Sequence, residues 1–204
     1  MTEEDIPSDH DFSNPTYVRQ WLHETTQKNP ERPAFFDAFV AEVTAEGVPG
    51  ASILELGSGP GVLAEQLLDR CDVGRYWLVD FSAPMHEMAR ERLGDDERVV
   101  YVEADFKQPS WTASVSSPVD IVVSLQALHE LRHCSRVPGL YRQVTQVLRP
   151  GGLILICDHL RPDDDQRALF MTIDEHLAAM KDGGLAGASL VLAVGNKALF
   201  KGRS

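Results

Sequence analysis

The chain has 204 residues, of which 43% are hydrophobic and 25% charged, and this length and balance are typical of a single globular domain. Its 31 acidic and 19 basic residues give a formal net charge of −12, which disfavours binding along a nucleic-acid backbone or an anionic membrane. Three widely spaced cysteines, Cys71, Cys134 and Cys157, argue against a disulfide framework or a zinc site. No apolar run approaches the roughly 20 residues of a membrane helix, and no signal sequence is recognisable, so we expect a soluble, cytoplasmic protein.

The N-terminal part is expected to form a polar tail and a cap segment over residues 1–33. Within it, residues 15–23 can place their apolar side chains on one face of a short helix. A longer helix is predicted from Ala34, because apolar residues recur there at helical spacing until Gly47 ends the pattern. Residues 34–204 are then expected to form one domain.

Strands and helices alternate through the middle of the chain. Five short apolar runs have the composition of strands buried in a parallel sheet: Ile53–Leu56, Tyr76–Val79, Val99–Val102, Ile121–Leu125 and Leu153–Cys157. Helical patterns separate most of them: Val62–Arg70, Pro84–Leu93 and Leu140–Leu148. This order predicts right-handed crossovers and a doubly wound α/β sheet.

The C-terminal part predicts a different ending to the sheet. A helix is expected over residues 163–181, with Asp163, Asp164 and Asp165 at its positive end. Two further strands, Ser189–Val194 and Lys197–Lys201, flank Gly195-Asn196, a dipeptide typical of a tight hairpin. We therefore expect a seven-stranded, mostly parallel sheet that finishes with an antiparallel hairpin strand.

A glycine-rich turn follows the first strand. Gly57, Gly59 and Gly61 lie between that strand and the next helix, where glycine permits a sharp turn and close approach of a ligand. The spacing differs from a dinucleotide fingerprint, because Val62 stands where the third glycine would be needed. Glu55 would repel a pyrophosphate but would attract an ammonium group.

Two acidic residues end or follow the next strands. Asp80 can accept hydrogen bonds from both hydroxyls of a ribose, a role that suits NAD equally well. Asp105 is suited to the exocyclic amine of adenine, which is a donor.

These residues resemble the class I S-adenosylmethionine-dependent methyltransferases over residues 35–204. The matching segments are Glu55–Gly61, Val79–Ser82, Glu103–Phe106, Val119–Ser124 and Leu148–Gly152. The resemblance implies a Rossmann-like fold for residues 34–204 and S-adenosylmethionine as cofactor, with S-adenosylhomocysteine as product. Carried over residue by residue, it implies the following cofactor contacts: Glu55, Gly57, Ser58, Gly59, Gly61, Asp80, Phe81, Ser82, Met85, Asp105, Phe106, Leu125 and Gln126.

The segment after the fourth strand resembles the one that carries the general base in some O-methyltransferases. His129 lies there, and imidazole can accept a hydroxyl proton near neutral pH. The alternative is a histidine that only shapes the pocket. Asp158 and His159 end the fifth strand at the same rim and are secondary candidates for substrate contact.

The substrate site is expected beneath the N-terminal aromatic residues. Tyr17 and Trp21, together with Phe35 and Phe36, are hypothesised to cap it, as N-terminal helices do in the family. The Asn/Asp-Pro-Pro-Tyr signature of amino-methylating enzymes is absent at Ser124–Ala127, and no acidic metal-binding set follows. The sequence thus favours metal-free, in-line methyl transfer to a small molecule by a monomer or homodimer.

Three alternatives stay open. An NAD-dependent oxidoreductase is disfavoured by the glycine spacing and Glu55. An aminopropyl transferase shares the fold, but its acidic polyamine-site signature is missing. A non-catalytic cofactor- or partner-binding protein on the same fold is the third, because a fold does not fix a function.

Overall fold

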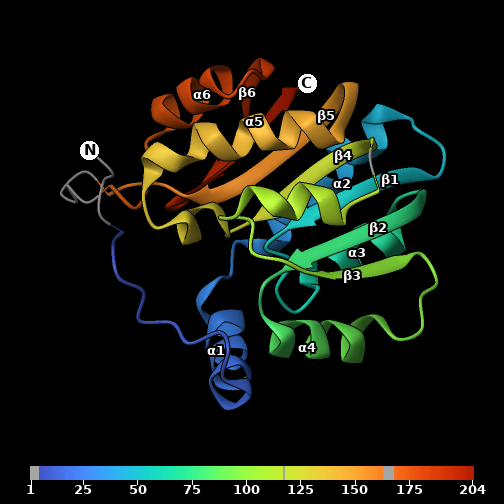
Figure 1. Cartoon of the computed structure of the whole chain (residues 1–204), viewed down its shortest axis with the longest axis vertical. Coiled ribbons are helices and arrows are strands. Elements are labelled where there is room, and N and C mark those ends of the chain that lie inside the picture. The colour runs from blue at the N-terminus through green and yellow to red at the C-terminus, as the bar shows by residue number, and fades with distance from the viewer. Residues whose placement is uncertain (1–4, 117, 163–167) are drawn as a thin grey trace.

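Seven strands form one sheet in the computed structural model, which describes residues 5–116, 118–162 and 168–204 (Figure 1). The strands are β1 (Ala51–Leu56), β2 (Val73–Asp80), β3 (Val99–Glu103), β4 (Val119–Leu125), β5 (Leu148–His159), β6 (Ala186–Val194) and β7 (Lys197–Arg203). Their order is β3-β2-β1-β4-β5-β7-β6. Strands β1 to β5 pair in parallel, and β7 runs antiparallel to both β5 and β6. The expected doubly wound sheet with its antiparallel hairpin strand is confirmed.

Helices connect the strands as the sequence predicts, with differences at their ends. They are α1 (Pro15–Lys28), α2 (Arg32–Glu46), α3 (Val62–Arg70), α4 (Ala83–Leu93), α5 (Val137–Val147) and α6 (Ile173–Asp182), with 3-10 turns η1 (Pro109–Ser114), η2 (Leu128–Leu131) and η3 (Cys134–Arg136). Helix α1 continues five residues beyond its expected end at position 23.

The expected helix over residues 163–181 is not continuous, because the described residues 168–172 are not helical. Helix α6 begins at Ile173, because Thr172 and Glu175 form a reciprocal capping box that satisfies the free N–H groups there. The aspartates Asp163, Asp164 and Asp165 lie outside the described residues.

Two apolar clusters cover the two faces of the sheet. Side chains alternate between the faces along a strand, as in β5, where Leu153 and Leu155 join one cluster and Ile154 joins the other. The face that carries Leu153 and Leu155 packs against α2, α3 and α4, and the face that carries Ile154 packs against η1, α5 and α6. This three-layer packing buries both faces, which is why these strands are apolar on both sides.

Phe35, a suggested part of the cap, is fully buried on α2 and packs in the core, so that suggestion is wrong. Phe36 is partly buried against the same cluster. Helix α1 instead packs beside α4, where Arg19 forms an ion pair with Glu91 at 3.2 Å (Figure 1). Among the described residues, no helix is both long and apolar enough to cross a membrane.

Candidate active site

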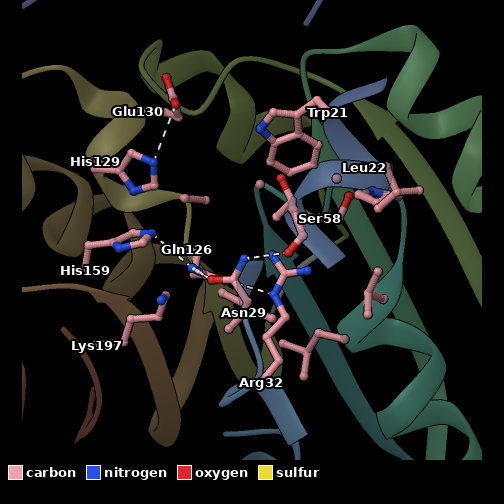
Figure 2. A pocket seen from close by; sticks show the side chains of 18 of the residues that line it. Trp21, Leu22, Asn29, Arg32, Ser58, Gln126, His129, Glu130, His159 and Lys197 are labelled. Carbon is pink, nitrogen blue, oxygen red and sulfur yellow. Dashed lines mark hydrogen bonds and ion pairs between the residues drawn. The ribbon is translucent and has the colours of Figure 1, made fainter. Parts of the chain in front are cut away.

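A cavity of about 730 Å³ opens at the carboxyl ends of β1, β2, β4 and β5 (Figure 2). The strand order reverses between the adjacent strands β1 and β4, because the chain adds β2 and β3 on one side of β1 and places β4 and β5 on the other. In doubly wound sheets, ligands bind at the position where the strand order reverses. The walls come from the N-terminal segment, the start of α2, the glycine-rich turn, the ends of β2, β4 and β5, and the β6–β7 turn. The volume suits a ligand of cofactor size.

The glycine-rich turn forms one wall of this cavity. Gly57 and Gly59 have φ values of 64° and 51°, in the left-handed region that glycine tolerates best. A Cβ on Gly57 would lie 2.3 Å from Cβ of Ala127, so the turn and the end of β4 are packed too closely for a side chain. A Cβ on Gly59 would meet nothing nearer than Sδ of Met85 at 4.0 Å, so the backbone there borders open space.

Asp80 fixes the shape of the turn. Its Oδ2 accepts the N–H of Gly59 at 2.8 Å, and its Oδ1 accepts the N–H of Ser82 at 2.9 Å. Each carboxylate oxygen can still accept another donor. Burial raises the pKa of Asp80 despite these hydrogen bonds, so added donors from a ligand would favour the ionised form.

Glu55 lies at the base of the cavity and is 2% exposed. Burial raises its pKa to about 8, although the hydroxyl of Tyr76 donates a hydrogen bond to Oε2 at 2.8 Å and acts in the opposite direction. Asp80 nearby adds to the increase. Glu55 is therefore mostly protonated at neutral pH, and a cation bound in the cavity would ionise it.

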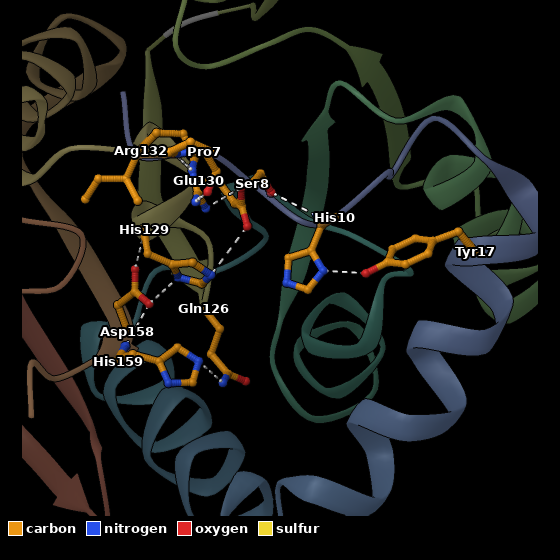
Figure 3. Close-up of polar contacts among 11 residues, drawn as sticks. Pro7, Ser8, His10, Tyr17, Gln126, His129, Glu130, Arg132, Asp158 and His159 are labelled. Carbon is orange, nitrogen blue, oxygen red and sulfur yellow. Dashed lines mark hydrogen bonds and ion pairs between the residues drawn. The ribbon is translucent and has the colours of Figure 1, made fainter. Parts of the chain in front are cut away.

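His129 and Asp158 form a hydrogen-bonded pair at the rim (Figure 3). Nδ1 of His129 lies 2.8 Å from Oδ1 of Asp158, and the backbone N–H of His129 donates to Oδ2 at 2.9 Å. Nε2 lies 3.5 Å from Oε1 of Glu130. Burial lowers the pKa of His129, but the charges of Asp158 and Glu130 and the hydrogen bond that the ring donates to Asp158 outweigh it and raise the pKa.

The carboxylate of Asp158 accepts three N–H groups. Its Oδ1 also accepts the N–H of His159 at 2.7 Å. Burial alone would raise its pKa, but the charge and hydrogen bond of His129, with the contribution of His159, lower the pKa to about 2. Asp158 therefore stays ionised and holds the ring of His129 with Nδ1 as donor and Nε2 toward Glu130.

Gln126 connects His159 with Arg32 across the cavity (Figure 2). Its backbone has φ 56°, an uncommon value for a residue with a side chain. Nε of Arg32 donates to Oε1 of Gln126 at 3.0 Å, which turns the amide nitrogen toward Nε2 of His159 at 3.0 Å. His159 thus accepts at Nε2, and burial lowers its pKa to about 4, so the ring is neutral at physiological pH.

His129, Asp158 and His159 also have the donor atoms of a metal site, since these atoms lie within 4.8 Å of one another. Both oxygens of Asp158 already accept N–H groups. The geometry therefore describes a polar hydrogen-bonded cluster, and metal-free chemistry stays a prediction.

Most of the sequence-predicted site residues line the cavity. They are Trp21, Glu55, Gly57, Ser58, Gly59, Asp80, Phe81, Met85, Phe106, Leu125, Gln126, His129 and His159. Asp158 is not among the described lining residues, and neither are four further predicted contacts: Tyr17, Gly61, Ser82 and Asp105.

These four have local structural contacts. Gly61 begins α3 with φ 73°, and a Cβ there would lie 3.2 Å from that of Ala89. The hydroxyl of Ser82 caps α4 at Met85, and Asp105 accepts the N–H of Lys107 at 2.9 Å. The Tyr17 hydroxyl binds Nδ1 of His10 (Figure 3). Their assignment to ligands stays a prediction.

Sequence reasoning missed several residues that line the cavity, among them Phe12, Arg32 and Lys197. Phe12 lies in an irregular segment, and its ring contacts those of Trp21 and Phe81 at centroid distances of 5.3 and 6.5 Å. Lys197 is buried and pairs with Glu31. No local pattern marks these residues, because segments distant in the chain bring them together.

The methyltransferase-domain family model matches residues 53–152. Residues of the chain are 33% identical over 109 positions to an uncharacterized methyltransferase of Geobacillus kaustophilus, which covers 53% of this chain and 47% of that protein. They are 27% identical over 165 positions to a highly reducing polyketide synthase, pkhB, of Emericella nidulans, which covers 73% of this chain and 6% of that one. The chain thus spans half or less of these curated relatives.

Solved structures share the fold. PigF with S-adenosylhomocysteine aligns over 97% of this chain and 63% of its own, with a TM-score of 0.75 at 16% identity. Human N-acetylserotonin methyltransferase with S-adenosylmethionine aligns over 98% of this chain and 60% of its own, with a TM-score of 0.73 at 14% identity. The carbon methyltransferase of CurJ aligns over 76% of this chain and 48% of its own, with a TM-score of 0.64 at 15% identity.

The doubly wound sheet and the glycine-rich turn beside Asp80 define a nucleoside-binding α/β protein. With the family match, they place residues 53–152 in the methyltransferase-domain family, and the chain has the fold of solved S-adenosylmethionine-dependent methyltransferases. Residues of the cavity fit that cofactor: the Gly59 backbone borders open space, Asp80 can accept hydroxyl donors, and the buried Glu55 suits an ammonium group.

Proposed function

We propose that the chain transfers a methyl group from S-adenosylmethionine to a small-molecule acceptor without a metal. The observation that carries this proposal is the His129–Asp158 pair at the rim of the cavity lined by the glycine-rich turn. When bound, the cofactor supplies an electrophilic methyl group on a sulfonium. The chain's own residues hold the reactants in line, and such alignment is worth about 7–11 kcal/mol in favourable cases.

The proposed cofactor contacts divide the cavity. Glu55 pairs with the ammonium group, Asp80 accepts the ribose hydroxyls, and Phe81 with Met85 lies against the adenine. Leu125 and Gln126, at the end of β4, then border the reacting centre. The acceptor occupies the remaining part beside Trp21, His129 and His159.

His129 is the proposed general base. Asp158 accepts the proton of Nδ1, so Nε2 can take a proton from an acidic hydroxyl or carbon of the acceptor. The Glu130 carboxylate near Nε2 stabilises the resulting imidazolium. His159, neutral at physiological pH, contributes a polar wall without competing for that proton.

Residues of the N-terminal part, positions 5–33, act as the proposed cap. Nε of Arg132 donates to the backbone carbonyl of Ile6 at 2.8 Å. The hydroxyl of Ser82 donates to the backbone carbonyl of Phe12 at 2.5 Å. These contacts tie the segment to the η2 turn on one side of the cavity and to α4 on the other. Such a cap would exclude water from the reacting atoms.

The test combines binding with turnover. Calorimetry would measure S-adenosylmethionine binding to the wild type and to Asp80→Ala, and S-adenosylhomocysteine release would be assayed with phenols, hydroxy acids and β-keto thioesters. We expect micromolar binding that Asp80→Ala weakens, and turnover that His129→Ala lowers about 100-fold without loss of cofactor binding. Tight cofactor binding with no turnover on any acceptor would favour a non-catalytic binding protein.

A further inference from the structure

Residues 5–12 form a strap that runs from η2 to α4 without a helix or a strand (Figure 3). Two of its residues, His10 and Phe12, line the cavity. A segment without regular secondary structure opens at little cost unless contacts with the rest of the chain hold it. The position of the strap over the cavity therefore depends on the contacts at its two ends.

At the η2 end, the strap and Arg132 exchange hydrogen bonds in both directions. Nε of Arg132 donates to the carbonyl of Ile6 at 2.8 Å, and Nη2 donates to the carbonyl of Pro7. The N–H of Ile6 donates in return to the carbonyl of Arg132 at 3.1 Å. Asp5 adds an ion pair with Arg136. Arg132 is 8% exposed, so the strap carbonyls stand where water would otherwise solvate its guanidinium.

Arg132 also ends the turn that carries the proposed base. Its backbone N–H donates to the carbonyl of His129 at 3.0 Å, and its Nη1 lies 3.5 Å from Oε2 of Glu130. Its φ is 64°, a value that a residue with a side chain keeps only where its surroundings impose it. Because the internal hydrogen bonds of a short 3-10 turn are weak, external contacts decide the conformation of η2. Asp158 supplies such contacts at its start, and the strap supplies them at its end.

We propose that Arg132 is a positioning residue that couples closure of the strap to the placement of Glu130 and of Nε2 of His129. The inference rests on the proposed function, in which Nε2 takes a proton from the acceptor. When the strap leaves, Arg132 loses the hydrogen bonds to Ile6 and Pro7, and the left-handed end of η2 relaxes. Glu130 then moves away from Nε2. The base is thus complete only while the cavity is covered, so proton transfer takes place away from bulk water.

Ile6→Pro tests the coupling from the strap alone, since residue 6 is not among the described lining residues of the cavity. Proline removes the N–H that residue 6 donates to the carbonyl of Arg132. With an acceptor that the wild type methylates, kcat should fall about 3- to 10-fold while KM for S-adenosylmethionine stays within about twofold. Ile6→Ala is the matched control, because it shortens the side chain but keeps the N–H, and its kcat should stay within about twofold of the wild type.

Arg132→Met tests the same contact from the η2 side. It should lower kcat about 10- to 100-fold with the same small change in KM for S-adenosylmethionine. Arg132→Lys, which keeps the charge but loses the fork of donors, should restore part of kcat. The double variant with Ile6→Pro should be no more than about twofold slower than Arg132→Met, because both changes remove one shared contact. Arg75→Met removes an exposed arginine outside the cavity and controls for net charge.

Hydrogen exchange followed by NMR measures the coupling without turnover, and Ile6→Pro keeps it testable if Arg132→Met does not fold. The amides of Glu130 and Arg132, which donate to carbonyls within the turn, should exchange faster in Ile6→Pro than in Ile6→Ala, while those of α5 do not change. The proposal is overturned if these two amides exchange equally in both variants, or if kcat is equal in both. If the wild type does not bind S-adenosylhomocysteine, the proposed function fails instead, and the exchange comparison still decides whether the strap and η2 are coupled.

Discussion

Nδ1 of His129 lies 2.8 Å from Oδ1 of Asp158, while the backbone N–H of His129 donates to the other oxygen of the same carboxylate. One buried acid thus holds both the ring and the backbone of the proposed base. The two residues come from different elements, the η2 turn and the end of β5. Their contact sets the direction of Nε2 and the protonation of the ring.

Asp158→Asn should lower the pKa of His129, because the negative charge that favours the protonated ring is removed. Because the folded-state pKa is raised, the pair stabilises the fold fully below the unfolded pKa, and this contribution is lost as pH rises through the folded pKa. NMR titration of the imidazole C–H signals measures the shift. Asp174→Asn, an exposed change on α6, is the control. An unchanged pKa in Asp158→Asn would contradict the pairing.

Glu55 should make cofactor binding depend on pH. Its pKa of about 8 means that it must lose a proton to pair with an ammonium group. S-Adenosylhomocysteine binding should therefore tighten up to about tenfold per pH unit below pH 8 and level off above it. Calorimetry in buffers of different ionisation enthalpy would detect the released proton. Glu55→Gln should bind S-adenosylhomocysteine with an affinity that does not change over this pH range. An equally steep dependence of affinity on pH in that variant would contradict the role of Glu55.

The same carboxyl group predicts the pH dependence of stability. Glu55 is ionised in the unfolded chain above its ordinary pKa but stays protonated in the fold up to about pH 8. The free energy of unfolding should therefore fall as pH rises from the ordinary range to about 8, and change little from this group above that. Urea unfolding of the wild type and Glu55→Gln between pH 5 and 9 measures the difference. If Glu55→Gln leaves the pH dependence of the unfolding free energy unchanged, that dependence belongs to other groups.

Gly57→Ala should destabilise the fold more than a glycine change of equal backbone strain. A left-handed conformation costs an L-residue about 1–2 kcal/mol, and the 2.3 Å approach to Ala127 adds overpacking of about 1–3 kcal/mol. Gly187→Ala is the matched control, since its φ is 62° but nothing lies within 4 Å of an added Cβ. Equal losses of unfolding free energy in urea would show that the turn relaxes away from Ala127.

Phe12→Ala should weaken S-adenosylhomocysteine binding about two- to tenfold, because the ring lines the cavity beside Phe81 and aromatic contacts of this kind are worth about 0.5–1.5 kcal/mol. Fluorescence or calorimetric titration measures the affinity. Leu190→Ala, an exposed change on β6 outside the cavity, should have no effect. If Phe12→Ala binds as the wild type does, the N-terminal segment does not contribute to the cofactor site.

Chelation tests the metal-free mechanism. Dialysis against EDTA should leave methyl transfer within about twofold, because the hydrogen bonds that Asp158 accepts already stabilise its charge. Inactivation by EDTA that Mg²⁺ or Zn²⁺ reverses would instead assign the His129, Asp158 and His159 cluster to a metal.

The sequence by itself determined the strand and helix order and the place of the glycine-rich turn. Buried parallel strands read as short runs of branched apolar residues, as β1 and β4 show, and these signals are local. Helix boundaries were less accurate where capping side chains decide them, as at Thr172 for α6. The expected roles of Asp80 and Glu55 as cofactor contacts follow from their sequence positions relative to this turn.

Only the tertiary structure decided which distant residues complete the cavity. Arg32 reaches it from the start of α2, and Phe12 from a segment without regular spacing. Asp158 stood out in sequence only as a rim residue, whereas its contact with His129 depends on β4 and β5 lying side by side. Periodicity and motif spacing encode local backbone geometry. The partners of a side chain, and therefore its charge and pKa, depend on how the sheet brings separate segments together.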